Sequence, residues 1–380
     1  CVCGQNIVPE SIADLEKLSG AKIKDLHKPE IDGVEIKCPK CGKQAKRVSE
    51  VLDSWIEAGS APYAERHYPF EKIDVNEFFP PDFITEYTGQ IRAWFYVLHV
   101  ISTAIFGQKA YKNVLVTGVI LGTDGRKMSK NYGNYPDPKE MLQKYGGDAL
   151  RLYLLGSPLM QGEDIKISEE AYRNQVKGLL LILWNIYNFF ITYAIVDDFQ
   201  PTNASFTPKN ILDKWILSRL AGNIDAVTTK GYEKYNTNEV VGQFAQMMQD
   251  LSLWYVRRSR DRVGPTAKDK KDKVDAYQTL WIVLVEYLKV LAPTIPFTAE
   301  EIFTNLTGEA SVHLQSWPTL PKTWVNKEIE SSMDLTLSLS SKIHAFRKEA
   351  NLKVRIPLKT ASYTGPKELS AEYLDLVQAE

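Results

Sequence analysis

The sequence carries almost no net charge, and it has no cysteine beyond residue 41. Its 46 lysines and arginines against 47 aspartates and glutamates give a formal charge of -1, which excludes a chain that is strongly basic or acidic throughout. Confinement of all four cysteines to one end argues against a secreted disulfide framework, because such bridges are normally spread over the chain. A metal site in a cytoplasmic protein fits this distribution better.

Long hydrophobic runs and an initiator methionine are also missing. The longest apolar stretch, residues 179–191, is shorter than the roughly 18 residues that span a bilayer. It also contains Asn185 and Asn188, so we interpret it as a buried helix, and we expect neither a membrane protein nor a signal peptide. The first residue, Cys1, suggests a segment of a longer protein. A hydrophobic content of 44% is enough to bury more than one core, which excludes a disordered chain.

Turn signals and apolar spacing predict an α/β part at the beginning of the chain. Turn-forming residues interrupt the segment 1–50 at short intervals. This pattern predicts a small zinc-ribbon-like insert with one helix near residues 9–18. Residues 51–168 alternate β-rich runs with helices. The runs at 83–86 and 113–121 predict strands of a buried parallel sheet, and the spacing of bulky residues between them predicts a helix at 90–104.

The rest of the chain is predicted to be mainly helical. Pro136, Asp137 and Pro138 form a stop, an N-cap and a first helical proline, and Gly146 follows the last turn. Residues 169–334 predict an all-α bundle. Its expected helices are 170–195, 209–231, 237–262, 274–292 and 297–306. Residues 335–380 predict the start of a further α/β region, with a helix ending near Ala350 and a strand at 352–358.

The cysteines predict a zinc site. Cys38-Pro39-Lys40-Cys41 is a C-x-x-C turn followed by a glycine, an arrangement that presents two thiolates to one tetrahedral Zn(II). Cys1 and Cys3 supply the other two ligands, although their C-x-C spacing is one residue shorter than usual. The alternative is a degenerate site or a set of unligated thiols, and metal analysis distinguishes the two.

A second motif predicts phosphate chemistry. Gly125 and Arg126 precede Lys127-Met128-Ser129-Lys130, directly after the second predicted strand and its turn. Two lysines three residues apart on a loop can bring two ammonium groups to a triphosphate, where they stabilise the charge that develops during attack on phosphorus. No Walker-type glycine loop is present for that purpose. The alternative is a solvated basic turn.

These residues resemble the KMSKS signature of the class I aminoacyl-tRNA synthetases, with Asn131 in place of the final serine. Further segments resemble the isoleucine branch of that family in the same order along the whole chain. They are VLDSW at 51–55 with Gly59-Ser60, EYTGQIRAWF at 86–95, NYPDP at 134–138, WYVRRSRDR at 254–262, LAPTIPFTAEEIF at 291–303 and KVRIPL at 353–358.

The resemblance implies a fold and a reaction. It implies the C-terminal half of a Rossmann-like catalytic domain (residues 51–168) followed by an anticodon-binding bundle. The family's HIGH signature and editing domain are expected before Cys1. The reaction would ligate L-isoleucine to tRNA(Ile) through an adenylate formed from ATP with Mg(II), and the protein is expected to be a monomer. A valyl- or leucyl-type enzyme and a noncatalytic tRNA-binding paralogue are the alternatives.

The resemblance also assigns residues to the substrates. Lys127 and Lys130 would be catalytic, and Met128 and Ser129 would join them at ATP. Trp55, Glu86, Gln90 and Trp94 would hold the amino acid or its adenylate, with the two indoles as flat apolar walls. The chain departs from the family pattern at Tyr87, Gly89 and Ala93, where Gly, Asp and Gly are expected, so Gly89 is left out of the site.

One segment of the predicted bundle is strongly basic. Residues 257–273 carry eight positive and three negative side chains, a local charge of +5 in a chain that is otherwise near neutral. Arg257, Arg258, Arg260 and Arg262 lie beside Trp254 and Tyr255, and cations next to aromatic rings suit phosphate and single-stranded base contacts. We therefore predict tRNA binding by the four arginines. A solvated, internally paired helix end is the alternative.

Overall fold

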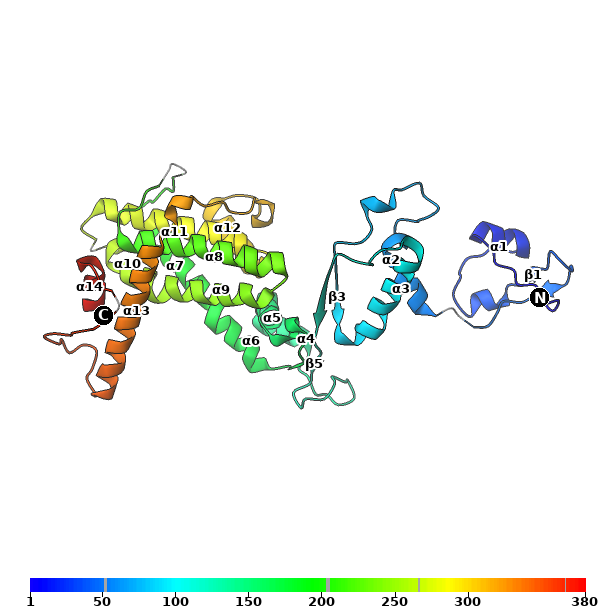
Figure 1. Cartoon of the computed structure of the whole chain (residues 1–380), viewed down its shortest axis with the longest axis horizontal. Coiled ribbons are helices and arrows are strands. Elements are labelled where there is room, and N and C mark those ends of the chain that lie inside the picture. Colours follow the sequence, from blue (N-terminus) through cyan, green and yellow to red (C-terminus); the bar gives the residue numbers. More distant parts are fainter. Residues whose placement is uncertain (51–52, 203–205, 266, 366) are drawn as a thin grey trace. The chain divides into compact units, whose positions relative to one another are not determined.

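The computed structural model describes residues 1–50, 53–202, 206–265, 267–365 and 367–380 (Figure 1). The chain divides into two compact units. One comprises Cys1–Ile84 and Gly89–Asn113, and the other comprises Thr85–Thr88 and Val114–Glu380. Val51 and Leu52, which begin the VLDSW motif, lie outside the described residues.

The cysteine-bearing segment contains the predicted helix and a short hairpin. Helix α1 (Ile12–Ser19) begins at an N-cap, Ser11, whose side chain accepts a hydrogen bond from Asp14 N, and it ends at Gly20 in the left-handed conformation. Strands β1 (Ile36–Lys37) and β2 (Gln44–Ala45) are antiparallel. The turn between these strands carries Cys38 and Cys41. The predicted helix is confirmed.

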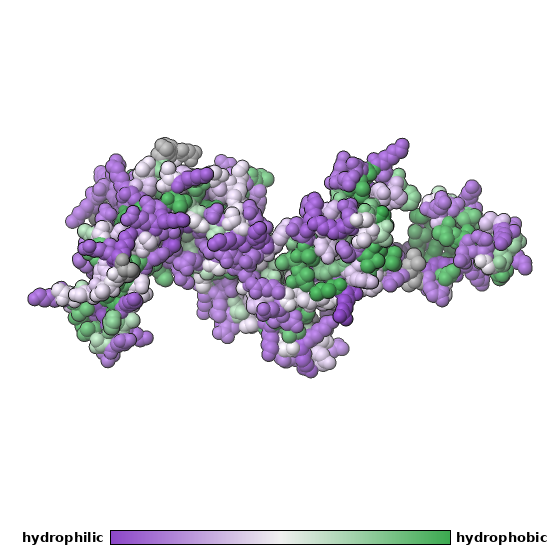
Figure 2. Space-filling view, viewed as in Figure 1, coloured by the Kyte–Doolittle hydropathy of each residue, from purple (hydrophilic) through white to green (hydrophobic). Residues whose placement is uncertain are grey.

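The rest of the first unit is a pair of packed helices, α2 (Ser54–Ala64) and α3 (Trp94–Phe106). They approach closely at Gly59, where a Cβ atom would lie 2.8 Å from Ile101 Cδ1 and 2.9 Å from Val97 Cγ1. Residues Thr88–Arg92 form a 3-10 turn, so the helix predicted at 90–104 begins only at Trp94. Figure 2 shows hydrophobic residues gathered over these two helices.

The strands differ from the sequence prediction. Strand β3 (Phe83–Tyr87) pairs with β4 (Asn113–Thr117), and β5 (Ile120–Leu121) pairs in parallel with β6 (Ile165–Lys166). The single strand predicted at 113–121 is thus broken in two. The prediction that these strands belong to a buried parallel sheet is wrong. Ile84 alone is buried among the residues of β3 and β4, because two-stranded pairs leave their faces uncovered.

The break between β4 and β5 occurs where another segment passes very close. Gly118 N donates to Leu159 O at 2.9 Å, and Val119 N donates to the Asp164 carboxylate at 2.8 Å. A Cβ atom at Gly118 would lie 1.9 Å from Glu163 O. The backbone therefore leaves the β4 ladder at a glycine that no larger residue can replace without movement.

The bundle in the second unit confirms the predicted helices. Its core contains the fully buried aromatic side chains Trp215, Phe244, Tyr255, Tyr287 and Phe303. Three helices continue through π-helical turns, namely Val176–Leu180, Val227–Gly231 and Asp250–Val256. The helices of this unit are α4 (Pro138–Tyr145), α5 (Gly147–Leu155), α6 (Glu169–Gln175), α7 (Leu181–Val196), α8 (Ile211–Ala226), α9 (Thr237–Gln249), α10 (Arg257–Val263), α11 (Lys270–Leu291), α12 (Pro296–Thr307), α13 (Lys327–Glu349) and α14 (Ala371–Gln378).

The caps of α4 and the end of α13 also agree with the sequence. Asp137 accepts hydrogen bonds from Lys139 N at 2.7 Å and Glu140 N at 3.3 Å, so it is the N-cap of α4. Helix α13 ends at Glu349, next to the predicted end. The strand predicted at 352–358 is wrong. In the described chain this segment pairs with no strand, and the Arg347 guanidinium donates instead to Ile356 O at 2.8 Å.

The helix that contains residues 179–191 is more apolar than the length of that uninterrupted apolar stretch suggested. The continuous helix Glu169–Val196 contains an 18-residue window with a mean hydropathy of 1.9, so by length and composition it could cross a membrane. The window reaches this value although the run contains Asn185 and Asn188. Leu183, Ile186 and Phe190 on the same helix are buried in the bundle core, although only 33% of the apolar window is buried.

Candidate functional site

The Lys127–Lys130 segment forms a loop directly after β5. The turn that precedes it contains Gly125 in the left-handed conformation (φ 81°) and is closed by a hydrogen bond of 2.7 Å from Gly122 N to Arg126 O. Lys127 then pairs with Leu121 as an isolated antiparallel bridge. The loop is therefore built on the end of a strand, as the sequence predicted.

Both lysines of the motif are free to bind a ligand. Lys127 and Lys130 are exposed and form no ion pair in the described part of the chain, whereas Met128 and Ser129 are half-buried. Lys127 and Met128 also line an open pocket of about 310 Å³ whose other walls come from Tyr87, Gly118, Val119 and Ile120. Tyr87, one of the departures from the family pattern, thus lies next to the lysine loop.

A carboxylate and an amide organise the base of the loop. Asp124 accepts hydrogen bonds from Arg126 N at 3.0 Å, from Arg126 Nε at 2.8 Å and from Asn134 Nδ2 at 2.9 Å. The Arg126 backbone N–H, the Asn134 amide and the Arg126 side chain together lower the pKa of Asp124 to about 2. The Arg126 guanidinium also lies 4.5 Å from the centre of the Tyr132 ring. Arg126 is therefore engaged, unlike the two lysines.

The residues predicted for the amino acid are distributed over the two units. In the first unit, Trp94 Nε1 donates to Ala58 O on α2 at 2.9 Å, and Trp94 N donates to the Gln90 side-chain oxygen at 3.1 Å. These bonds fix the half-buried indole at the start of α3. Trp55 is 39% exposed near the start of α2. In the second unit, Glu86 is exposed and its carboxylate accepts from Tyr87 N at 3.2 Å.

The structure brings the four predicted metal ligands together. The Sγ atoms of Cys1, Cys3, Cys38 and Cys41 all lie within 4.8 Å of one another. Cys1 and Cys41 are 3.4 Å apart, and Cys3 and Cys38 are 3.8 Å apart. Four thiolates around a tetrahedral Zn(II), with bonds of about 2.3 Å, would be separated by about 3.8 Å. The donor set and its spacing therefore fit zinc.

The backbone around the cysteines also favours thiolate. Backbone N–H groups of Cys41 and then Lys40 lower the pKa of the Cys38 thiol to about 7. The main chain is held in place by Cys38 N, which donates to Lys43 O at 2.9 Å, and by Gly42 N, which donates to Cys38 O at 2.9 Å. Thiolate is the form that binds metal.

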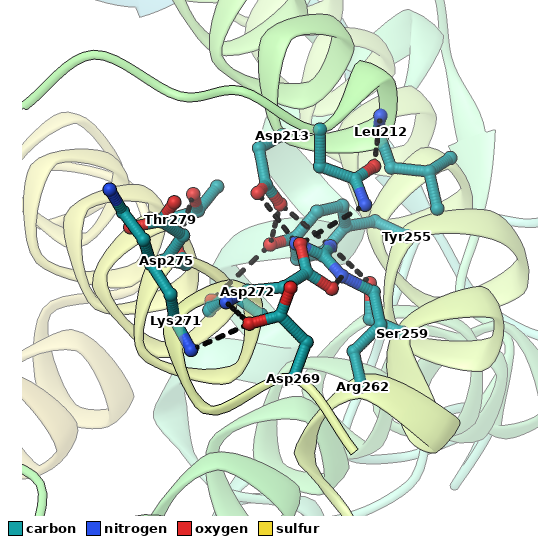
Figure 3. Close-up of polar contacts among 12 residues, drawn as sticks. Leu212, Asp213, Tyr255, Ser259, Arg262, Asp269, Lys271, Asp272, Asp275 and Thr279 are labelled. Atoms are coloured by element: carbon teal, nitrogen blue, oxygen red, sulfur yellow. Dashed lines mark hydrogen bonds and ion pairs between the residues drawn. The ribbon is translucent and has the colours of Figure 1, made fainter. Parts of the chain in front are cut away.

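The four predicted tRNA-binding arginines occupy different environments. Arg262 is almost buried, with 10% of its side chain exposed, and it faces Asp213 on α8 and Asp272 on α11 (Figure 3). Its guanidinium makes hydrogen bonds of 2.7 to 2.9 Å to both carboxylates and one of 3.3 Å to Ser259 Oγ. All five N–H donors of an arginine are thereby used.

The two carboxylates around Arg262 favour its charged form inside the bundle. Burial by itself lowers the pKa of Arg262, but the hydrogen bonds that it donates to Asp213 and Asp272 outweigh burial and raise the pKa. The same guanidinium lowers the pKa of Asp272. Tyr255 completes the cluster by donating its hydroxyl to the Asp213 carboxylate at 2.7 Å. This cluster joins α8, α10 and α11.

Two of the other arginines bind the end of the described chain. Arg257 pairs with the Glu380 side chain, and Arg258 donates to Ala379 O at 3.1 Å. Arg260 is exposed, and its side chain forms no ion pair or hydrogen bond with the described residues. Lys268 lies in the loop that follows and Lys270 in the first turn of α11. Both are exposed, and their side chains have no partner among the described residues. The formal +5 charge is thus largely balanced, apart from this outward-facing group.

Family comparisons agree with the two-part fold. Residues 4–168 match the model described as tRNA synthetases class I (I, L, M and V), and residues 213–362 match the anticodon-binding domain of tRNA ligase. Taken with the strand-borne lysine loop and the helical bundle, these matches show that the chain belongs to the class I tRNA synthetases.

Within that family, the chain is similar to several isoleucine–tRNA ligases. Those of Treponema denticola and Chlamydia trachomatis serovar D are 41% and 42% identical over 94% and 96% of this chain. A third, from Protochlamydia amoebophila, is 42% identical over 94% of the chain. The chain spans about a third of the length of these relatives, with 34% and 35% of the first two covered.

Solved structures support the fold. An Agrobacterium radiobacter K84 LeuRS, determined in a ternary complex with tRNA and LeuAMS, matches with a TM-score of 0.60 at 20% identity, over 77% of this chain and 36% of that one. Mycobacterium tuberculosis methionyl-tRNA synthetase, in complex with methionyl-adenylate, matches with a TM-score of 0.56 at 18% identity, over 77% and 58%.

Proposed function

We propose that this chain is part of an enzyme that ligates L-isoleucine to tRNA(Ile) at the expense of ATP. The observation that carries the proposal is the pair of exposed lysines Lys127 and Lys130, on a loop built at the end of a strand and without an ion-pair partner among the described residues. The identity of 41–42% with isoleucine–tRNA ligases along almost the whole chain supports the choice of isoleucine.

In the proposed first step, a carboxylate oxygen of isoleucine attacks the α-phosphorus of ATP. An oxygen–phosphorus bond forms, the bond to the bridging oxygen breaks, and pyrophosphate leaves with the electron pair. Lys127 and Lys130 donate to the phosphate oxygens on which charge accumulates, and Met128 and Ser129 lie beside ATP in the same loop. Mg(II), bound with ATP, would neutralise phosphate charge, and we assign it no ligand on this chain.

In the second step, a ribose hydroxyl at the tRNA 3′ end attacks the carbonyl carbon of the adenylate, and AMP leaves. The amino acid would lie against Trp55 and Trp94, and its ammonium group would meet Glu86. Support for Trp94 comes from its two hydrogen bonds: the bond to Ala58 O orients the indole, and the bond from its main-chain N to Gln90 holds the backbone before any ligand arrives. Gln90 provides one of these bonds and therefore positions Trp94.

The test is amino-acid-dependent exchange of pyrophosphate into ATP by the full-length protein that contains this chain. Isoleucine should support exchange at a much higher kcat/KM than valine or leucine. Exchange that prefers valine or leucine would replace isoleucine as the substrate. Absence of exchange with every amino acid, in a protein that still binds tRNA, would instead favour a noncatalytic tRNA-binding role.

That second role has one specific observation in its favour. Tyr87 stands where the family has glycine, and its side chain lines the pocket beside Lys127 and Met128. A ring at this position occupies space that glycine leaves open. The variant Tyr87→Gly separates the two roles, because in an active enzyme it should leave exchange intact or increase it.

We further propose that the four cysteines bind one Zn(II) with a structural role. The site has four protein ligands and no open position, which is typical of structural rather than catalytic zinc. The metal would join the residues around Cys1 to the hairpin that carries Cys38. One zinc per chain by elemental analysis of protein purified under reducing conditions supports this assignment, and zinc-free protein with unchanged folding refutes it.

The predicted tRNA-binding arginines differ in whether their side chains are available to contact tRNA. Arg260, with Lys268 and Lys270, has its charge available, so we propose that these residues bind phosphates. Arg257 and Arg258 reach RNA only if they release the residues at 379–380. Neutralising Arg260, Lys268 and Lys270 together should weaken tRNA binding. The slope of log K against log salt should also become shallower, by about 0.7 to 0.9 for each phosphate that the protein no longer neutralises. An unchanged salt slope would exclude them from the interface.

A further inference from the structure

A buried amide lies inside the base of the lysine loop and takes no part in the chemistry proposed above. Asn134 is 7% exposed and lies five residues after Ser129. Buried polar side chains cost free energy unless all their hydrogen bonds are made. The partners of Asn134 therefore indicate what the residue does.

The partners of Asn134 are distributed over the whole motif. Its Nδ2 donates to Asp124 Oδ1 at 2.9 Å and to Lys127 O at 3.3 Å, and its Oδ1 accepts from Ser129 N at 3.1 Å. Two acceptors thus face the nitrogen and one donor faces the oxygen, so the orientation of the amide is determined by its neighbours. The main-chain oxygen of Asn134 accepts in addition from Thr123 N at 2.8 Å.

These hydrogen bonds restrain the peptide groups on either side of Met128. Lys127 is held through its carbonyl oxygen and Ser129 through its N–H, both by one side chain. The two exposed lysine side chains therefore leave from backbone whose position is already determined before a ligand binds. Such preorganisation removes part of the entropic cost of placing two long, flexible side chains on one phosphate group.

The turn opposite Asn134 is shaped to accept it. A Cβ atom at Gly122 would lie 2.3 Å from Asn134 Nδ2 and 2.5 Å from Asn134 Cγ, so a larger residue would displace the amide. Asp124 is held in turn by the Arg126 N–H and guanidinium. Gly122, Asp124 and Asn134 together form a closed polar arrangement beneath the lysine loop.

We propose that Asn134 is a positioning residue for the reaction with ATP, acting through the backbone of Lys127 and Ser129. The inference rests on the proposed function, since it concerns the same loop. Asn134 touches no reacting atom. It fixes the backbone from which the side chains of Lys127 and Lys130 extend toward the phosphates. Its loss should impair transition-state stabilisation more than substrate binding.

The test uses the full-length enzyme with Asn134→Asp and Asn134→Ala. The aspartate keeps the acceptor for Ser129 N but loses both N–H donors and places a second carboxylate against Asp124. Asn174→Asp is the matched control, because Asn174 is exposed on α6 and has no partner among the described residues. Isoleucine-dependent pyrophosphate exchange gives kcat and KM, and limited trypsin digestion reports cleavage after Lys127 and Lys130.

We expect kcat to fall by about 10- to 100-fold in both Asn134 variants, the effect of losing two or three partly buried hydrogen bonds. The KM for isoleucine should stay within about twofold, and trypsin should cut the loop faster, with no change in Asn174→Asp. The double variant Asp124→Asn with Asn134→Asp restores an amide beside a carboxylate and should recover part of kcat.

Two results would overturn the inference. One is a wild-type kcat in both Asn134 variants. The other is a loss of kcat that the double variant does not relieve, accompanied by unchanged trypsin cleavage of the loop. A different outcome concerns the function itself: if the unmodified full-length protein shows no exchange with any amino acid, the proposed reaction fails, whereas trypsin cleavage still measures whether Asn134 restrains the loop.

Discussion

Replacing Arg262 with alanine should destabilise the helical bundle severely. Asp213 is completely buried, and of its partners only Tyr255 would remain in the described chain. Breaking a buried ion pair by removing one partner costs about 3 to 5 kcal/mol, because the other charge stays buried without compensation. With a urea m-value of about 3 kcal/mol/M, the unfolding midpoint should fall by about 1 to 2 M.

The matched control lies two residues away on the same helix. Arg260→Ala removes the same type of side chain from an exposed position, where it has no partner in the part of the chain that the structure describes, so its effect should stay within about 0.5 kcal/mol. Both variants are compared with the unmodified protein by urea unfolding, followed by circular dichroism at the helix band. In tRNA binding the order should reverse, with Arg260→Ala the weaker binder among folded proteins.

A second variant isolates the cause. Adding Asp213→Asn to Arg262→Ala removes the stranded charge, and the double variant should regain at least about 1 kcal/mol over Arg262→Ala alone. The reasoning is refuted if Arg262→Ala is as stable as Arg260→Ala to within about 1 kcal/mol. Arg262 would then be one more surface cation rather than the centre of the cluster that joins α8, α10 and α11.

Three further predictions concern the loop, the zinc site and a buried acid. Lys130→Ala in the full-length enzyme should lower the rate of isoleucine-dependent pyrophosphate exchange by at least about tenfold and leave isoleucine affinity nearly unchanged. Cys38→Ser should abolish zinc binding and expose residues 1–50 to protease, because the metal supplies much of the folding energy of such small sites. Asp250 is buried near Arg219, and burial, opposed by Arg219, raises its pKa to about 6. The folded state then holds the proton more tightly than the unfolded state, so this group's contribution to stability is lost as pH rises from about 4 to 6. Asp250→Asn should therefore gain stability relative to the unmodified protein between pH 4 and pH 8, measured by urea unfolding at both values.

Each of these predictions can fail clearly. Unchanged exchange in Lys130→Ala would remove that lysine from the reaction. Full zinc content in Cys38→Ser would exclude Cys38 as a ligand, and Lys40→Ala, an exposed change in the same turn, is the control. For Asp250, the idea is wrong if the stability difference between the two proteins is the same at both pH values. Asp261→Asn, an exposed acid on the following helix, should show no such difference.

Much of the local structure followed from short-range signals in the sequence. Asp137 before Pro138 predicted the start of α4, and Gly146 its end, because an N-cap oxygen and a glycine satisfy the unpaired groups of helix ends. The heavy apolar content of 274–292 predicted α11, whose residues are buried in the core. The C-x-x-C turn predicted which cysteines would gather. Each signal is contained within one or two helical turns of chain.

The failures have a common cause in long-range interactions. The strand predicted at 113–121 breaks at Gly118 because residues 159–164 pass against it, and no local pattern reveals that approach. The strand predicted at 352–358 has the right composition but no partner strand in the described chain. In the sequence Asn134 stands out only as the first residue of the NYPDP motif, since its partners at 124, 127 and 129 are not visible as a pattern.

The sequence by itself determined the order of the helices, the gathering of the four cysteines at one end and the position of the lysine loop after a strand. These depend on residue type and spacing over a few residues. Only the tertiary structure decided which charges are available. Arg260 and Arg262 are indistinguishable in a basic run, yet among the described residues the fold brings Asp213 and Asp272 to Arg262 and no partner to Arg260. Burial and pairing, not composition, decide the role of a charge, because an ion inside a protein must be compensated by groups that the fold supplies.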